Sequence, residues 1–143
     1  MTKLDEIVAD FEFIDDWEER YRYLIELGRT LEPLAPQAHN DVNKVRGCAS
    51  QVWLQTDLAV VDGQRVLRFT GDSDAHIVRG LVAVVIAMFS GRTPEAIIAT
   101  DPEATFVKLS LREHLTPQRS NGVNSMIQRI KHDAQTVLAA STG

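Results

Sequence analysis

Apolar residues recur at helical spacing along the N-terminal part of the chain, which predicts two helices there. The first helix, expected over residues 4–14, carries one apolar face formed by Leu4, Ile7, Val8 and Phe11. Asp15 is a candidate N-cap for the second helix, because Glu18 follows at the capping-box spacing. Gly28 is typical of a helix C-terminus and is expected to end that helix. Prolines and asparagines over residues 32–46 then predict an irregular loop.

The periodicity changes to alternation after residue 50, as in a strand with one buried face. The positions expected on the buried face of this strand are Val52, Leu54, Leu58 and Val60. The pair Asp62-Gly63 tolerates the positive φ angles of a two-residue turn, so a return strand is expected over residues 65–70. The segment Gly71-Asp72-Ser73-Asp74 is expected to end that strand and to supply N-cap side chains for the next helix.

The second half of the chain is predicted to be mostly helical. Residues 75–90 are apolar on nearly every side, which predicts a helix at the buried centre of the fold. The pairs Thr93-Pro94 and Asp101-Pro102 each begin a short helix, since proline is tolerated at the first helical position. Residues 116–121 are expected to form a polar loop before a last helix with one apolar stripe. We therefore predict one α+β domain over residues 1–143, with a small antiparallel β-sheet packed against several α-helices.

The charge of the chain disfavours two classes of partner. A formal net charge of −5, with no cluster of Lys and Arg to offset it, disfavours nucleic acid and anionic membrane surfaces. The longest apolar run, over residues 81–89, is about half as long as a bilayer-spanning helix. The N-terminal residues 1–6 lack the apolar core of an export signal. We therefore expect a cytoplasmic protein that does not span a membrane.

Cys48 is the only cysteine in the sequence, which limits the chemistry open to it. A lone cysteine cannot form an internal disulfide, and it cannot supply the four ligands that a structural zinc ion or an iron–sulfur cluster usually takes. The four histidines show no spacing that would place two of them on one helical face as metal ligands. No metal site is expected from the sequence.

Cys48 is expected at the tip of a loop, because it lies between the irregular segment and the first strand. Gly47 permits a turn that presents the thiol, and the positive charges of Lys44 and Arg46 favour the reactive thiolate. Two other interpretations stay open from the local sequence alone. Free cysteines are often small buried hydrophobes, and a cysteine with an unplaced histidine such as His114 is also compatible with a hydrolase.

Two further segments have both a functional and a structural interpretation. Residues 72–74 are compatible with a metal or phosphate loop, although such a run before an apolar helix is more often only a cap. Residues 119–122 are compatible with an anion site before a helix N-terminus, or with a solvated loop.

Several segments, taken together, resemble the SufE family of sulfur acceptor proteins, which includes the CsdE branch. The matching segments are VRGCASQVWL (residues 45–54), GDSDAHIVRGL (71–81), GRTP (91–94), HLTPQRSNG (114–122) and, upstream, YRYLIELG (21–28). They occur in the family's order and extend over nearly the whole chain. The element around the cysteine is quite specific, and one small departure is Gln118, where many relatives carry serine.

The resemblance implies a fold shared with the iron–sulfur scaffold proteins, and it implies Cys48 as the sulfur acceptor. The donor would be a pyridoxal-phosphate cysteine desulfurase of the SufS or CsdA type, which holds the sulfur as a persulfide. The chain would then be a relay protein and an activator of the desulfurase, not an enzyme, and it would bind no cofactor of its own. Family members are described as holding the resting cysteine in an apolar pocket until the desulfurase docks. The residues that the resemblance implies beside the cysteine, for partner binding or loop support, are Arg46, Gly47, Ser50, Asp72, Asp74 and Arg119.

The resemblance also implies a downstream partner, either a SufBCD-type scaffold or another sulfur acceptor, in iron–sulfur cluster assembly. Scaffold relatives carry three cysteines, so the single thiol of this chain favours sulfur relay over cluster holding. Two alternatives stay open: an allosteric activator that carries no sulfur, and a scaffold-like protein that borrows ligands from a second chain. The sequence does not distinguish between candidate desulfurases, or between a monomer and a homodimer.

Overall fold

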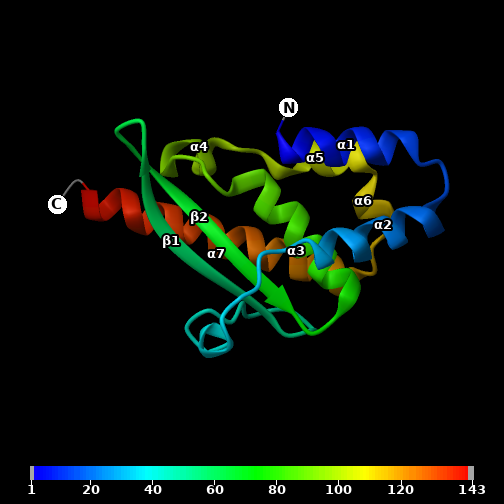
Figure 1. Ribbon diagram of the computed structural model, residues 1–143, viewed down its shortest axis with the longest axis horizontal. Helices are drawn as coiled ribbons and strands as arrows, with labels where there is room; N and C mark the ends of the chain where they lie inside the picture. Colours follow the sequence, from blue (N-terminus) through cyan, green and yellow to red (C-terminus); the bar gives the residue numbers. More distant parts are fainter. Residues whose placement is uncertain (1, 142–143) are drawn as a thin grey trace.

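The computed structural model describes residues 2–141, with residue 141 described by its backbone alone. Over these residues the chain forms a two-stranded sheet and a set of helices, which confirms the predicted α+β class (Figure 1). In chain order the elements are α1 (Lys3–Phe13), α2 (Trp17–Arg29), the 3₁₀ turn η1 (Pro36–Ala38), β1 (Val52–Val61), β2 (Gln64–Ser73), α3 (His76–Phe89), α4 (Pro94–Ala99), α5 (Pro102–Leu109), α6 (Leu111–His114) and α7 (Pro117–Ser141).

The sheet is an antiparallel hairpin of β1 and β2, paired in register along its full length from the Val52–Ser73 pair to the turn. Both central residues of the turn have positive φ angles, 52° at Asp62 and 79° at Gly63. This geometry confirms the predicted two-residue turn, whose twist matches that of the strands it joins.

The outer half of β1 departs from the predicted burial. Val52 and Leu54 are fully buried, whereas Leu58 is 52% exposed and Val60 is 69% exposed. The hairpin extends outward from the helices that cover its base, so the apolar side chains near its turn reach solvent (Figure 1). Alternation along a strand predicts which side chains share a face, but not how far along the strand that face is covered.

β2 continues through the residues that are predicted to end it. It runs to Ser73, because Asp72 and Ser73 still pair across the ladder with Trp53 and Val52. The prediction that this segment caps the next helix is also wrong. Ala75 occupies the N-cap position of α3, with no side-chain cap hydrogen bond.

α3 lies at the centre of the fold, as its apolar sequence predicts. It contacts α1, α2, α7 and β2, and the hydrophobic core surrounds it. The buried residues of this helix are Val78, Gly80, Leu81, Val82, Ala83, Val84, Val85, Met88 and Phe89. Among residues 2–141, no helix is long and apolar enough to cross a membrane.

α2 and α3 cross in close contact at two glycines, Gly28 and Gly80, which we call the glycine crossing. A Cβ atom at Gly28 would lie 2.8 Å from the backbone nitrogen of Gly80, and a Cβ atom at Gly80 would collide with the carbonyl oxygen of Leu24. The prediction that Gly28 ends its helix is therefore wrong, since α2 continues to Arg29. The glycine is needed for close approach of the two backbones, not for a turn.

The start of α2 differs from the prediction by one residue. Asp16, not Asp15, is the N-cap, and its carboxylate accepts the N–H of Glu18 at 3.2 Å. An aspartate at either position satisfies the local pattern, so the choice depends on where the chain leaves α1.

The start of α7 differs more, because the polar loop predicted over residues 116–121 is helical from Pro117 onward. Thr116 Oγ1 accepts the N–H of Arg119 at 3.2 Å. Threonine followed by proline at the first helical position is also the start of α4, and aspartate–proline starts α5. The threonine–proline pair at residues 116–117 is therefore the same helix-start signal, although the residues that follow it are polar.

Candidate functional site around Cys48

The segment that carries the cysteine is fixed at both ends by backbone hydrogen bonds. Before it, the N–H of Val45 donates to the carbonyl oxygen of Val52 at 2.8 Å. After it, the N–H of Gln51 donates to Asp74 Oδ1 at 3.0 Å, and the N–H of Asp74 donates to the carbonyl oxygen of Gln51 at 3.2 Å. Residues 46–50, between these two anchors, form what we call the Cys48 loop.

Within the Cys48 loop, the contacts with α7 are long. Cys48 Sγ donates to the carbonyl oxygen of Gly122 at 3.6 Å, and Ser125 Oγ donates to the carbonyl oxygen of Gly47 at 3.5 Å. A thiol is a weak donor, and 3.5 Å is long for a hydroxyl, so neither bond contributes much stability. The loop is therefore held firmly at its ends and weakly in its middle.

Gly47 gives the loop its turn. Its φ angle is 89°, in the left-handed region that side chains other than glycine rarely adopt. A Cβ atom at this position would also lie 2.6 Å from Ser125 Oγ. Both the backbone angle and the close approach to α7 therefore require glycine immediately before Cys48.

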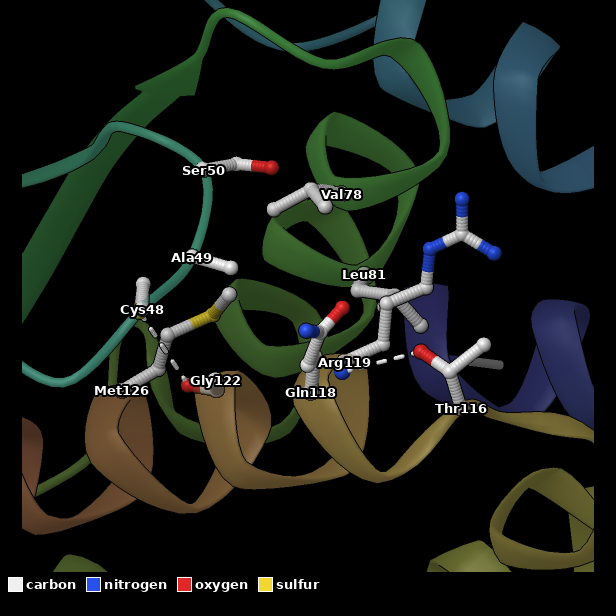
Figure 2. Close-up of a pocket in the computed structure, with 10 residues that line it drawn as sticks. All are labelled: Cys48, Ala49, Ser50, Val78, Leu81, Thr116, Gln118, Arg119, Gly122 and Met126. Atoms are coloured by element: carbon white, nitrogen blue, oxygen red, sulfur yellow. Dashed lines mark hydrogen bonds between the residues drawn. The ribbon is translucent and has the colours of Figure 1, made fainter.

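A pocket of about 200 Å³ lies beside the loop, between α3 and the first turns of α7 (Figure 2). Its lining is Cys48, Ala49, Ser50, Val78, Leu81, Thr116, Gln118, Arg119, Gly122 and Met126. Figure 2 shows Val78 and Leu81 on α3, Met126 on α7 and Ala49 on the loop, with the Arg119 guanidinium on the side of the pocket away from Cys48. The pocket is thus apolar next to the thiol and charged at its other side.

The thiol is partly buried, and this burial further favours its protonated form. Desolvation raises the pKa of Cys48 above its ordinary value of 9.0. The prediction that Lys44 and Arg46 favour the thiolate is therefore wrong for this conformation, in which the Arg46 residue is exposed. Since only the thiolate attacks sulfur, Cys48 in this position is a poor nucleophile at neutral pH.

The structure brings some of the predicted site residues together and leaves others apart. Ser50 and Arg119 line the pocket with the cysteine, and Asp74 anchors the end of its loop. Arg46 does not line this pocket but lines a second hollow, together with Lys44 and residues further along α7. Asp72 lines neither of these two hollows, and its carboxylate instead contacts two other side chains.

These two residues, His39 and Arg79, were not predicted to belong to the site region. His39 Nε2 lies 2.8 Å from Asp72 Oδ2, and Arg79 Nε lies 3.0 Å from Asp72 Oδ1, an ion-pair contact without hydrogen-bond geometry. His39 also packs edge-on against Trp53, which pairs with Asp72 across the hairpin. This cluster ties the segment after η1 to the end of β2 near the loop anchors. No local sequence signal links residues so far apart in the chain.

The pocket lining argues against the hydrolase interpretation. None of the histidines that the structure describes lines the pocket, and His114 instead stacks on Trp17, with ring centroids 3.7 Å apart. A cysteine hydrolase needs a base within hydrogen-bond reach of its thiol. In the described residues, no group of three His, Cys, Asp or Glu side chains is placed to hold a metal ion.

Fold and site together define an α+β protein with one thiol on a weakly held loop, next to a small pocket. The chain belongs to the SufE family, whose sequence profile, described as an Fe-S metabolism associated domain, matches residues 5–134. This membership supports a role in Fe–S metabolism.

Individual relatives agree with this assignment. The chain is 51% identical over 140 residues to an uncharacterized SufE-like protein from Rhizobium etli, a match that covers 98% of this chain and 95% of that one. It is also 51% identical over 140 residues to an uncharacterized SufE-like protein from Rhizobium meliloti, covering 98% of this chain and 100% of the relative. The solution structure of a hypothetical protein from Thermus thermophilus has the same fold, with a TM-score of 0.73 and 22% identity over 97% of this chain and 99% of that one.

Proposed function

We propose that the protein carries sulfur on Cys48. A cysteine desulfurase containing pyridoxal phosphate donates the sulfur, and docking of this chain stimulates the donor. Iron–sulfur cluster assembly, through a SufBCD-type scaffold or another acceptor, receives the sulfur. The chain acts in the cytoplasm as a relay protein and not as an enzyme in its own right, and the cofactor belongs to the donor.

The observation that carries this proposal is the way the Cys48 loop is held. Its ends are anchored by hydrogen bonds of 2.8 to 3.2 Å, while its described hydrogen bonds to α7 are long, at 3.5 and 3.6 Å. A carrier thiol has to enter a donor's active site and then return with its cargo. A loop that moves while its anchors stay fixed suits both steps.

The transfer is a thiol–disulfide type of exchange. The Cys48 thiolate attacks the terminal sulfur of the donor's cysteine persulfide, and a new sulfur–sulfur bond forms on Cys48. The sulfur–sulfur bond of the donor breaks, and its electron pair leaves with the donor's thiolate. The proton that Cys48 loses on becoming a thiolate goes to a base or to water in the docked complex. No oxidant or reductant is consumed, because the persulfide sulfur moves without a change in oxidation state.

Release from the pocket is the step that activates the thiol. Burial raises the pKa of Cys48, so extension of the loop into a polar site restores thiolate formation. On return, the apolar pocket beside Ala49, Val78 and Met126 shields the persulfide from small thiols and oxidants. Arg119 and Ser50, at the same pocket, serve partner binding or support of the loop.

The direct test is the intact mass of the protein after incubation with L-cysteine and a cysteine desulfurase. We expect a gain of one sulfur atom that a reductant removes. Cys48→Ser should fold with a change in stability of no more than about 1–2 kcal/mol and should gain nothing. A persulfide on the serine variant would disprove the relay.

The same assay separates relay from pure activation. If desulfurase turnover rises while the wild-type protein stays unmodified, the chain is an activator that carries no sulfur. Visible absorbance after anaerobic reconstitution with iron and sulfide would instead indicate a cluster held between two chains.

A further inference from the structure

A second hollow lies between the start of the Cys48 loop and α7, and it shares no lining residue with the pocket in Figure 2. Its volume is about 260 Å³. Lys44 and Arg46 line it from the loop segment, and Ser125, Arg129 and His132 line it from α7. The three α7 residues follow one another at helical spacing, so they lie on one face of that helix. We call this hollow the basic groove.

The basic groove carries positive charge that the protein does not neutralise. Among the described residues, no carboxylate lies within 4.0 Å of the charged groups of Lys44 or Arg46. Arg129 Nε lies 3.3 Å from Asp133 Oδ2, so one of the three permanent cations has a partner. That carboxylate also accepts a hydrogen bond from Thr56 Oγ1 at 2.6 Å. Lys44 and Arg46 therefore place two cations without a carboxylate partner beside Arg129 at one hollow of an acidic chain.

The basic groove is in direct contact with the Cys48 loop. Ser125 lines the groove, and its hydroxyl makes the 3.5 Å bond to the carbonyl oxygen of Gly47. Arg46 belongs to the loop itself and immediately precedes that glycine. A ligand that draws Arg46 or Ser125 into the groove therefore competes with one of the two weak bonds that hold the loop on α7.

We propose that the basic groove is the docking surface for an acidic segment of the sulfur donor. This inference rests on the proposed function, since it assigns a surface to the partner that loads Cys48. Carboxylates of the donor would pair with Lys44, Arg46 and Arg129 and so orient the donor at the groove. This pairing would also weaken the bond between Ser125 and Gly47 that holds the loop on α7. A nucleic acid is the less suitable occupant, because the rest of an acidic chain repels a long polyanion.

The test compares two charge reversals of equal size. Lys44→Glu/Arg46→Glu alters the groove, whereas Arg65→Glu/Arg68→Glu alters two exposed arginines of β2, and each pair changes the formal net charge from −5 to −9. Arg68 pairs with Asp57 and Arg65 with Val60 on the outer half of the hairpin, and neither arginine lines the groove. The probe is the desulfurase that loads the wild-type protein in the mass assay.

We expect the groove variant to raise the Kd for this desulfurase about tenfold or more at low salt, mainly through slower association. The hairpin variant should stay within about twofold of the wild type, and added salt should shrink the difference. Arg46→Glu alone, at an exposed residue, should give a smaller change in the same direction and serves as the variant least able to disturb folding. At saturating donor, the groove variant should still acquire sulfur, because Cys48 is intact.

Three outcomes would overturn the proposal. Equal Kd values for the groove and hairpin variants would show that total charge matters and the groove does not. A wild-type protein loaded with sulfur, together with unchanged binding of the groove variant, would reject the docking surface and leave the relay standing. If no desulfurase loads the wild-type protein, the relay itself fails, and the docking surface fails with it.

Discussion

Two places in this molecule bring a glycine against a neighbouring segment, and they differ in what the glycine touches. At the glycine crossing, the space for a Cβ at Gly28 or Gly80 is taken by backbone atoms of the opposite helix. At the Cys48 loop, Gly47 meets the hydroxyl of Ser125, and a Cβ at Gly122 would lie 3.6 Å from Cys48 Sγ. The first contact joins two backbones inside the core, and the second joins a loop to side chains at its edge.

This difference shows that one small protein combines a tight backbone contact with a loose side-chain contact. Backbone-to-backbone packing leaves no side chain that could rotate away, so the glycine crossing has one arrangement. Side-chain tips at van der Waals distance can separate without disturbing either backbone. The contact between α2 and α3 therefore resists separation more than the contact between the Cys48 loop and α7, where the bonds are 3.5 and 3.6 Å long.

The largest effect should come from filling the glycine crossing. Gly80→Ala places a methyl group against the carbonyl oxygen of Leu24, and the two helices have to move apart. We expect a loss of about 3 kcal/mol or more in the free energy of unfolding, because overpacking against backbone cannot relax by a rotamer change. Denaturant titration followed by circular dichroism measures it.

Gly122→Ala is the matched control, since it is also a glycine-to-alanine change within a helix. Its new methyl group would make ordinary contact with Cys48, at 3.6 Å from Sγ and 3.9 Å from Cβ. Alanine is favoured over glycine inside a helix by about 0.5–1 kcal/mol, so stability should stay level or rise. Equal losses in the two variants would show that the crossing is no tighter than the loop contact.

Sequence alone predicts the elements well and the contacts between them poorly. The hairpin turn at residues 62–63, the buried α3 and the proline-started helices follow from local rules, and the structure has all of them. Gly28 is misassigned because a glycine at a helix end and a glycine at a crossing give the same local signal. Only the partner, Gly80, distinguishes them, and nothing in the sequence pairs the two.

The same reasoning applies to the site. Cys48 and Gly47 were identifiable, because a lone thiol after a glycine is a local feature. The direction of the thiol's pKa was not, because neighbouring Lys44 and Arg46 are visible in the sequence while burial against α7 is not. The charged side chains of Lys44 and Arg46 instead line the basic groove together with residues of α7. That tertiary arrangement is not visible in the sequence.

The second largest effect should come from the loop's own glycine. Gly47→Ala forces alanine to adopt a φ of 89° and brings its Cβ within 2.6 Å of Ser125 Oγ. We expect a loss of about 1–2 kcal/mol, smaller than at the crossing because the loop can shift. The thiol should also alkylate faster, since the shift lifts Cys48 off α7.

Gly47→Ala/Ser125→Ala separates the two causes. Removing the hydroxyl relieves the close contact but leaves the backbone angle, so part of the stability should return. Full recovery would mean that the angle carries no strain. If Gly47→Ala lost as much stability as Gly80→Ala, the contrast between a rigid crossing and a yielding loop would be wrong.

The third effect is kinetic. In the free protein, Cys48 should react with iodoacetamide about tenfold or more slowly than a model cysteine at neutral pH, because it is partly buried with a raised pKa. The rate should keep rising above pH 9.0, the ordinary value for a cysteine. A desulfurase that lacks its own reactive cysteine should accelerate alkylation by favouring the extended loop, about tenfold for each 1.4 kcal/mol of differential affinity.

Alkylation at the rate of the model cysteine in the isolated protein would rule out the retracted thiol. Slower alkylation with the partner bound has two explanations, a loop held on α7 and a thiol covered by the partner. Gly122→Ala resolves them, because its methyl group adds cover only to the retracted thiol. The variant should slow alkylation of the free protein and leave the partner-bound rate unchanged.

The smallest effect concerns the cluster of His39, Asp72 and Arg79 near the loop anchors, and it depends on pH. His39 Nδ1 lies 3.0 Å from the carbonyl oxygen of Ala35, and Nε2 lies 2.8 Å from Asp72, which also contacts Arg79. Both ring nitrogens thus face acceptors, and only the protonated ring can donate to both. The hydrogen bond with Asp72 raises the pKa of His39 above its ordinary value of 6.5.

A group whose pKa is higher in the folded state stabilises the fold fully below its unfolded pKa, and that stability is lost as pH rises through the folded pKa. The free energy of unfolding should therefore fall more between about pH 6 and about pH 9 in the wild type than in His39→Gln, whose amide does not titrate there. Denaturant midpoints at both ends of this window measure the difference. Parallel pH profiles for the two proteins would show that His39 is not a protonated link between η1 and β2.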